Sequence, residues 1–134
     1  MKKRILFLLL SIALMAAIFY FSDMPAPQST SISKPVAESV GLSQKTVRKI
    51  AHFLCFFFLS GSLLGFFSTF KKLRRPYLFS YATTVLYAVT DEIHQYFVEG
   101  RSCELKDVLI DAAGALAFLL LWWGVLYLHR RKRT

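Results

Sequence analysis

Two adjacent carboxylates, Asp91 and Glu92, lie in a segment that otherwise has the composition of a membrane-spanning helix. His94 and Gln95 follow within about one helical turn, and Arg101 lies just beyond the segment. Acids, an imidazole, an amide and a guanidinium in one place can bind an anionic or hydrogen-bonding ligand, or transfer protons.

The depth of these carboxylates makes their charge costly. The segment runs from Tyr77 to Val98, and at about 1.5 Å per residue Asp91 lies roughly 21 Å into a hydrocarbon core about 30 Å thick. An acid near the centre of a spanning helix costs about 2.5 to 3.5 kcal/mol on insertion scales, and usually faces a bundle interior or a wet cavity. The pattern favours a functional site, with a structural ion-pair cluster that orients the helices as the alternative.

The composition fixes the class of protein. Of 134 residues, 55% are hydrophobic and 16% are aromatic, which is too apolar for a soluble domain of this length. The net charge of +9 does not indicate a nucleic-acid partner, because the basic residues lie at the ends of apolar runs, as membrane topology requires. We expect a single all-α integral membrane domain over residues 1–134, with the lipid bilayer as its surroundings.

Four apolar runs predict a bundle of four transmembrane helices. They cover about residues 5–21, 50–70, 77–98 and 108–128, and residues 22–49 form an external connection. The first run is predicted to be an uncleaved span, because it is long for a signal peptide and no small-x-small cleavage site follows. Within the connection, Ser22–Ser33 is rich in serine and proline and predicts an irregular loop, whereas Lys34–Val40 predicts a short surface helix.

The second span begins with a basic stripe. Ser43 is a plausible N-cap for a helix that reaches Phe70. Its first turns carry basic residues at helical spacing, namely Lys45, Arg48, Lys49 and His52. Farther along, Gly61 and Gly65 form a small-xxx-small pattern that lets another helix approach closely.

The distribution of charge predicts the orientation. If the N-terminus is cytoplasmic, eleven of the 17 lysines and arginines lie on the cytoplasmic side, which satisfies the positive-inside rule. Both termini are then cytoplasmic. All acidic residues fall on the outer side or in the outer halves of the spans, so the polar chemistry is expected on the external face.

Three spans carry polar groups to the same depth. Counting about 18 residues, or roughly 27 Å, from the inner ends of the second, third and fourth spans reaches His52, Gln95 and Asp111, respectively. We therefore predict a polar pocket that opens to the external face. Its expected residues are Lys49, His52, Asp91, Glu92, Gln95, Arg101, Asp107 and Asp111.

These residues also resemble a motif of the VanZ-like family of small bacterial membrane proteins. The matching positions are Lys49, His52 and Phe56, then Asp91, Glu92, Gln95, Phe97 and Arg101, then Asp107, Val108 and Gly114. The resemblance implies a bacterial plasma-membrane protein with an envelope role, because the family is named for a protein linked to resistance to the lipoglycopeptide teicoplanin. One departure is Asp111, where the family commonly has asparagine.

Two kinds of function remain open from the sequence. The first is a pocket that binds a lipid-linked envelope precursor or a lipoglycopeptide, with Lys49 and Arg101 holding anionic groups and the acids accepting hydrogen bonds. The second is an enzyme that uses His52 or His94 as general acid or base on a lipid-linked substrate, with or without a divalent metal. No metal or cofactor motif is present in the sequence, so none is expected. A transporter is disfavoured because four spans without a repeat would form no pore alone.

Cysteine labelling tests the predicted orientation. Cys103 lies in a connection expected outside, and position 73 in one expected inside. A membrane-impermeant maleimide added to intact cells should label Cys103. It should leave Leu73→Cys unmodified in a Cys103→Ser background, and the reverse pattern would refute the orientation.

Overall fold

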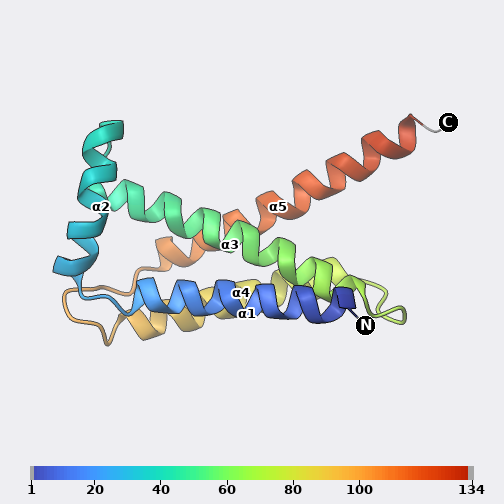
Figure 1. The fold of residues 1–134 in the computed structure, drawn as a ribbon, viewed down its shortest axis with the longest axis horizontal. Coiled ribbons are helices and arrows are strands. Elements are labelled where there is room, and N and C mark those ends of the chain that lie inside the picture. The colour runs from blue at the N-terminus through green and yellow to red at the C-terminus, as the bar shows by residue number, and fades with distance from the viewer. Residues whose placement is uncertain (1, 133–134) are drawn as a thin grey trace.

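The protein is all-helical in the computed structural model, which describes residues 2–132. Within these residues the chain forms five α-helices and no strand. The helices are α1 (Lys2–Ser22), α2 (Ala26–Val40), α3 (Gln44–Ser68), α4 (Pro76–Gln95) and α5 (Leu105–Arg131) (Figure 1). The predicted all-α class is confirmed.

Three helices of the described chain, α1, α3 and α5, are long and apolar enough to cross a membrane. Large apolar side chains such as Leu6, Phe19, Leu120 and Trp123 are exposed along α1 and α5, as a lipid environment allows. The predicted span over residues 77–98 corresponds to α4, which is not among the three. The reason is the polar content of α4, which is buried against the other helices.

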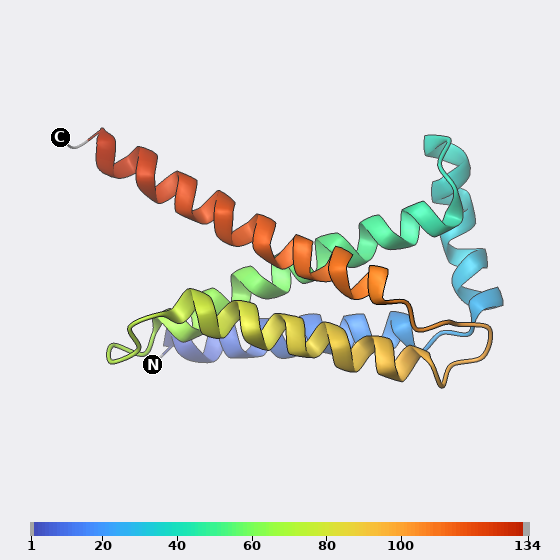
Figure 2. The same cartoon turned by 180° about the vertical axis from the view of Figure 1, so that it is seen from behind.

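Helix α3 lies at the centre of the fold. It packs against α1, α4 and α5, while α2 lies across one end of the molecule, over the first turns of α3 (Figure 1). The apolar core consists of Ile18 from α1, Phe56, Leu59 and Leu63 from α3, and Ala88 from α4. Helices α3 and α5 cross, and α5 then diverges from the bundle toward its C-terminal end (Figure 2).

Small hydroxyl side chains make up much of the interface between α3 and α4. Ser80 Oγ donates to the backbone carbonyl of Ser60 at 2.7 Å, and Thr84 Oγ1 donates back to Ser80 within α4. All three residues are fully buried. These hydroxyls find their hydrogen-bond acceptors inside the protein. The polar face of α4 can therefore pack against α3 instead of facing lipid or water.

The segment between the first two spans differs from its prediction. Residues 26–40 form one continuous helix, α2, so the expected irregular loop over Ser22–Ser33 is wrong for most of its length. Pro27 lies in the first turn of α2, where a missing N–H costs nothing, and Pro35 is accommodated inside the helix. Gly41 ends α2 with a left-handed backbone (φ 68°), and its N–H bonds to the carbonyl of Ala37.

Helix boundaries otherwise lie within a few residues of their predictions. Ser43 is the N-cap of α3, and its side chain accepts a hydrogen bond from the N–H of Thr46 at 3.1 Å. Helix α3 ends at Ser68 and α4 at Gln95, two and three residues before the predicted ends of their spans.

The glycines allow close approach, although not to a single partner helix. A side chain at Gly61 would collide with the ring of Phe118 on α5, and one at Gly65 with the ring of Phe7 on α1. The predicted small-xxx-small pattern therefore admits aromatic rings from two helices. Gly114 of α5 is tighter still, because a Cβ there would collide with the backbone carbonyl of Phe53 on α3.

The α3–α5 crossing predicts different effects for two glycine substitutions in α5. Gly114→Ala should destabilise the fold by about 1 to 3 kcal/mol, because rigid backbone cannot yield to the added methyl group. Gly124→Ala is the matched control, since a Cβ there meets nothing within 4 Å in the part of the chain described. Thermal unfolding of the purified variants in detergent measures the difference, and equal melting temperatures would contradict the close crossing.

Candidate functional site

The polar end of α4 is buried and bonded to the end of α1. Asp91, Glu92 and Gln95 are 3%, 2% and 5% exposed. Asp91 Oδ2 accepts hydrogen bonds from Ser22 Oγ at 2.8 Å and from Gln95 Nε2 at 3.0 Å. The carboxylate thus holds the last residue of α1 against the last turn of α4, as a buried charge requires.

Arg101 extends this network from the α4–α5 connection. Its guanidinium donates to Gln95 Oε1 at 3.2 Å, to the carbonyl of Phe21 at 2.9 Å and to the carbonyl of Met24 at 3.1 Å. Burial and the nearby Arg48 lower the pKa of Arg101 from its usual value. The side chain satisfies carbonyls at the end of α1 that no helical N–H can reach. That it also holds an anion stays a prediction.

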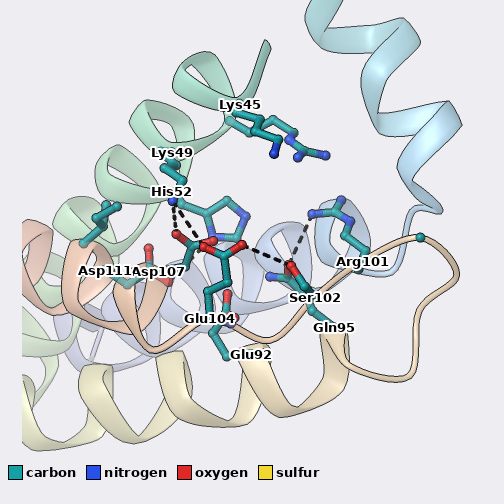
Figure 3. A pocket seen from close by; sticks show the side chains of 13 residues that line it. Lys45, Lys49, His52, Glu92, Gln95, Arg101, Ser102, Glu104, Asp107 and Asp111 are labelled. Carbon is teal, nitrogen blue, oxygen red and sulfur yellow. Dashed lines mark hydrogen bonds and ion pairs between the residues drawn. The ribbon is translucent and has the colours of Figure 1, made fainter. Parts of the chain in front are cut away.

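Lys49 of α3 is paired with acids of the α5 start. Its ammonium is bonded to Asp107 and lies 3.9 Å from Glu104 Oε2. Glu104 also accepts from Ser102 Oγ at 3.2 Å, and its backbone N–H donates to Glu92 Oε2 at 3.0 Å. Lys49 and Glu92 therefore hold the start of α5 against α3 and α4 (Figure 3).

His52 and Asp111 face each other between α3 and α5. His52 Nδ1 lies 3.7 Å from Asp111 Oδ2, too far for a hydrogen bond but close enough for electrostatic attraction if the imidazole is protonated. Asp111 is 1% exposed, and within the described chain neither of its carboxylate oxygens has a hydrogen-bond partner. Such buried oxygens call for a donor from a ligand or for a proton.

These side chains surround a cavity of about 220 Å³ (Figure 3). It is lined by Lys45, Arg48, Lys49, His52, Glu92, Gln95, Gly100, Arg101, Ser102, Glu104, Asp107, Ile110 and Asp111. Every residue predicted for the pocket is in the lining except Asp91, which lies behind Gln95 and is bonded to it. The structure thus brings together polar groups from three helices and one connection.

Sequence reasoning missed several residues of this cavity. Lys45 and Arg48 belong to the basic stripe but were not assigned to the pocket, and neither has a hydrogen bond or ion pair to any residue among 2–132. Glu104 and Ser102 have no helical register that would have placed them. Ser22 lacks any sequence signal, because its role depends on where α1 ends beside α4.

Other candidates lie elsewhere. His94 is outside the cavity lining, and its Nε2 lies 3.0 Å from Asp23 Oδ1 with its ring against Phe19. Cys55 and Cys103 are both free thiols, the first half-buried and the second exposed. Among the described residues, no three histidine, cysteine or acidic side chains are grouped closely enough to hold a metal ion.

The family comparison agrees with the spacing of the motif. A family model described as VanZ/LLP1 matches residues 7–128 of the chain. The chain belongs to the VanZ-like family. The match covers most of the VanZ-like chain and every residue of its polar cavity, and with the three apolar helices it indicates a multi-pass membrane protein. No curated protein sequence and no solved structure matches the chain significantly.

The different bonding of Arg101 and Arg48 predicts that substitution by lysine lowers the stability of the protein at the first position but not at the second. Arg101→Lys should destabilise the protein by about 1 to 3 kcal/mol, because an ammonium cannot reach all three acceptors and leaves buried oxygens unsatisfied. Arg48→Lys should leave stability within about 0.5 kcal/mol of the original, since no partner is lost. Thermal unfolding in one detergent compares them, and equal melting temperatures would argue against the structural role of Arg101.

Proposed function

We propose that this VanZ-like protein is a plasma-membrane protein of the bacterial envelope with four spans, both termini in the cytoplasm and the polar cavity on the external side. The buried polar face of α4 supports its role as the fourth span, because its outward side chains such as Leu78, Phe79 and Leu86 are apolar and exposed. The start of α1 and the end of α5 lie toward the same end of the molecule (Figure 1). This arrangement agrees with an even number of membrane crossings.

The cavity binds the charged head of a lipid-linked or amphiphilic envelope molecule, and through it changes susceptibility to glycopeptides such as teicoplanin. The observation that carries this proposal is the imbalance in the cavity lining. Lys45 and Arg48 are cations with no partner in the described chain, and Asp111 has oxygens without a donor. A ligand with a phosphate or carboxylate and a nearby hydroxyl, amide or amine group satisfies both sides.

Substitution of Arg48, one of the two unpartnered cations, should remove the phenotype without harming the fold. In cells that express the protein, Arg48→Gln should abolish any reduction in susceptibility to a lipoglycopeptide, because an amide cannot replace the charge. Lys34→Gln is the control, since among the described residues Lys34 pairs only with Glu38 on the exposed side of α2, at 3.9 Å. Minimum inhibitory concentrations at matched protein abundance measure the effect, and an unchanged value for Arg48→Gln would refute this role of the cavity.

Mass analysis of the protein extracted in mild detergent complements the phenotype. The proposal expects a co-purifying anionic lipid or lipid-linked precursor that is lost in Arg48→Gln and retained in Lys34→Gln. A protein that carries no such molecule, or carries it equally in both variants, would contradict the assignment.

A second candidate function rests on the pair of His52 and Asp111. An imidazole that lines the cavity 3.7 Å from a buried carboxylate would become a general base with its orienting acid if substrate binding brought the two within hydrogen-bond distance. The reaction class is hydrolysis or transfer at the anionic head of a lipid-linked substrate. Purified protein incubated with a polyprenyl diphosphate should then release product, and His52→Gln should abolish turnover while the substrate is still bound. Absence of product with the original protein removes this candidate.

A further inference from the structure

A second cavity adjoins the polar one on the side of α2. It has a volume of about 240 Å³ and lies between the end of α1, the inner face of α2 and the first turns of α3. Its apolar lining includes Ile18, Phe21, Ile32, Val36, Val47 and Ala51. We name this cavity the α2 groove. Its lining residues come from the end of the molecule where α2 lies over the first turns of α3, and Figure 1 shows that arrangement of the two helices.

Small side chains keep the α2 groove open and apolar. Ser29 and Ser33 face it from α2, and Ser33 Oγ donates to the carbonyl of Ser29 at 3.0 Å, so its hydroxyl is already satisfied within the helix. Ala51 faces it from α3 and leaves room that a larger residue would fill. The backbone N–H of Ala26 bonds to the carbonyl of Glu99 at 3.1 Å, which fixes the start of α2 beside the polar cavity.

The two cavities share part of their lining. Arg48, His52 and Arg101 line both of them. Arg101 is committed to protein acceptors, whereas Arg48 has no partner among the described residues. An anionic group bound by Arg48 would therefore lie at the junction, with polar walls on one side and apolar walls on the other.

The cavity volumes also favour a shared ligand. Ligand sites commonly measure about 300 to 1,000 Å³, and neither the polar cavity nor the α2 groove reaches that size alone. Within a bilayer a hydrocarbon chain gains little by leaving lipid for an apolar groove. The apolar groove therefore adds little affinity. Because it adjoins the polar cavity at Arg48, it instead selects for a molecule that has a hydrocarbon chain next to its anionic group.

We propose that the α2 groove holds a single hydrocarbon chain of a lipid-linked anion, whose charged group lies at Arg48 and whose head occupies the polar cavity. This inference rests on the proposed function and specifies its ligand. The recognised class is a lipid in which a phosphate or similar anion joins one chain to a polar head. Double-chain phospholipids are disfavoured, because the α2 groove beside Arg48 has a volume of only about 240 Å³.

A photoreactive single-chain alkyl phosphate tests the proposal. The probe is dodecyl phosphate with a diazirine at the chain end, added to the full-length protein in phosphatidylcholine nanodiscs. After irradiation, peptide mapping should place crosslinks within residues 29–36 and 47–55, which face the α2 groove. Ala51→Phe should lower crosslinking there by at least about tenfold, because the ring fills the space. Ala82→Phe, on the exposed face of α4, is the matched control and should not.

Each outcome separates the groove from the head site. Crosslinks in the α2 groove that are lost in both Arg48→Gln and Ala51→Phe support the proposal. Binding of the probe that depends on Arg48, with crosslinks spread along the exposed faces of α1 and α5, overturns the α2 groove but leaves the proposed function standing. Binding that is equal in the original protein and in Arg48→Gln overturns the head site, and the proposal for the groove with it.

Discussion

A carboxylate buried among apolar helices needs donors from its neighbours, and Asp91 is the residue on which this requirement falls most directly. The residue is 3% exposed, and its Oδ2 accepts hydrogen bonds from Ser22 of α1 and from Gln95 of its own helix. Gln95 in turn accepts from Arg101, whose remaining donors satisfy the end of α1. One buried charge thus positions the end of α1, the end of α4 and the connection to α5, because losing either partner would leave polar atoms unsatisfied in a medium of low dielectric.

The basic residues near the cavity divide into two groups by their bonding. Lys49 and Arg101 are bonded to acids, an amide or carbonyls, and they hold helix ends together. Lys45 and Arg48 lie on the same stripe of α3 as Lys49, yet their side chains form no hydrogen bond or ion pair within residues 2–132. Charge that is already paired contributes little to ligand binding, because a ligand must first replace its partner. The anion recognition that we propose would therefore depend on Lys45 and Arg48.

Helical periodicity in the sequence predicted the cavity residues that lie within the apolar helices, but not those that lie outside them. Counting residues along three apolar runs brought His52, Gln95 and Asp111 to one level, and all three line the cavity. Periodicity gave no position for Glu104 or Ser102, which come before the first turn of α5. Periodicity also failed for α2, because its serines and prolines are typical of a loop. Pro27 is compatible with a helix only because it lies in the first turn of α2. The partners of Arg101 were equally out of reach, because carbonyl groups at the end of a helix leave no mark in the sequence.

The buried polar residues divide into a structural cluster and a proposed functional site. Asp91, Glu92, Lys49 and Arg101 each have partners on neighbouring elements, so helix positioning explains them, although Asp91 Oδ1 accepts no hydrogen bond within the described chain. Asp111 differs from them: it is 1% exposed, the described chain offers neither of its oxygens a hydrogen bond, and His52 Nδ1, which is charged only when protonated, lies 3.7 Å from its Oδ2. A residue that costs stability without a compensating contact is typical of functional sites rather than of scaffolds. The unsatisfied acid and the unpartnered Arg48 line the same cavity, and a ligand with both an anionic group and a hydrogen-bond donor would complete both.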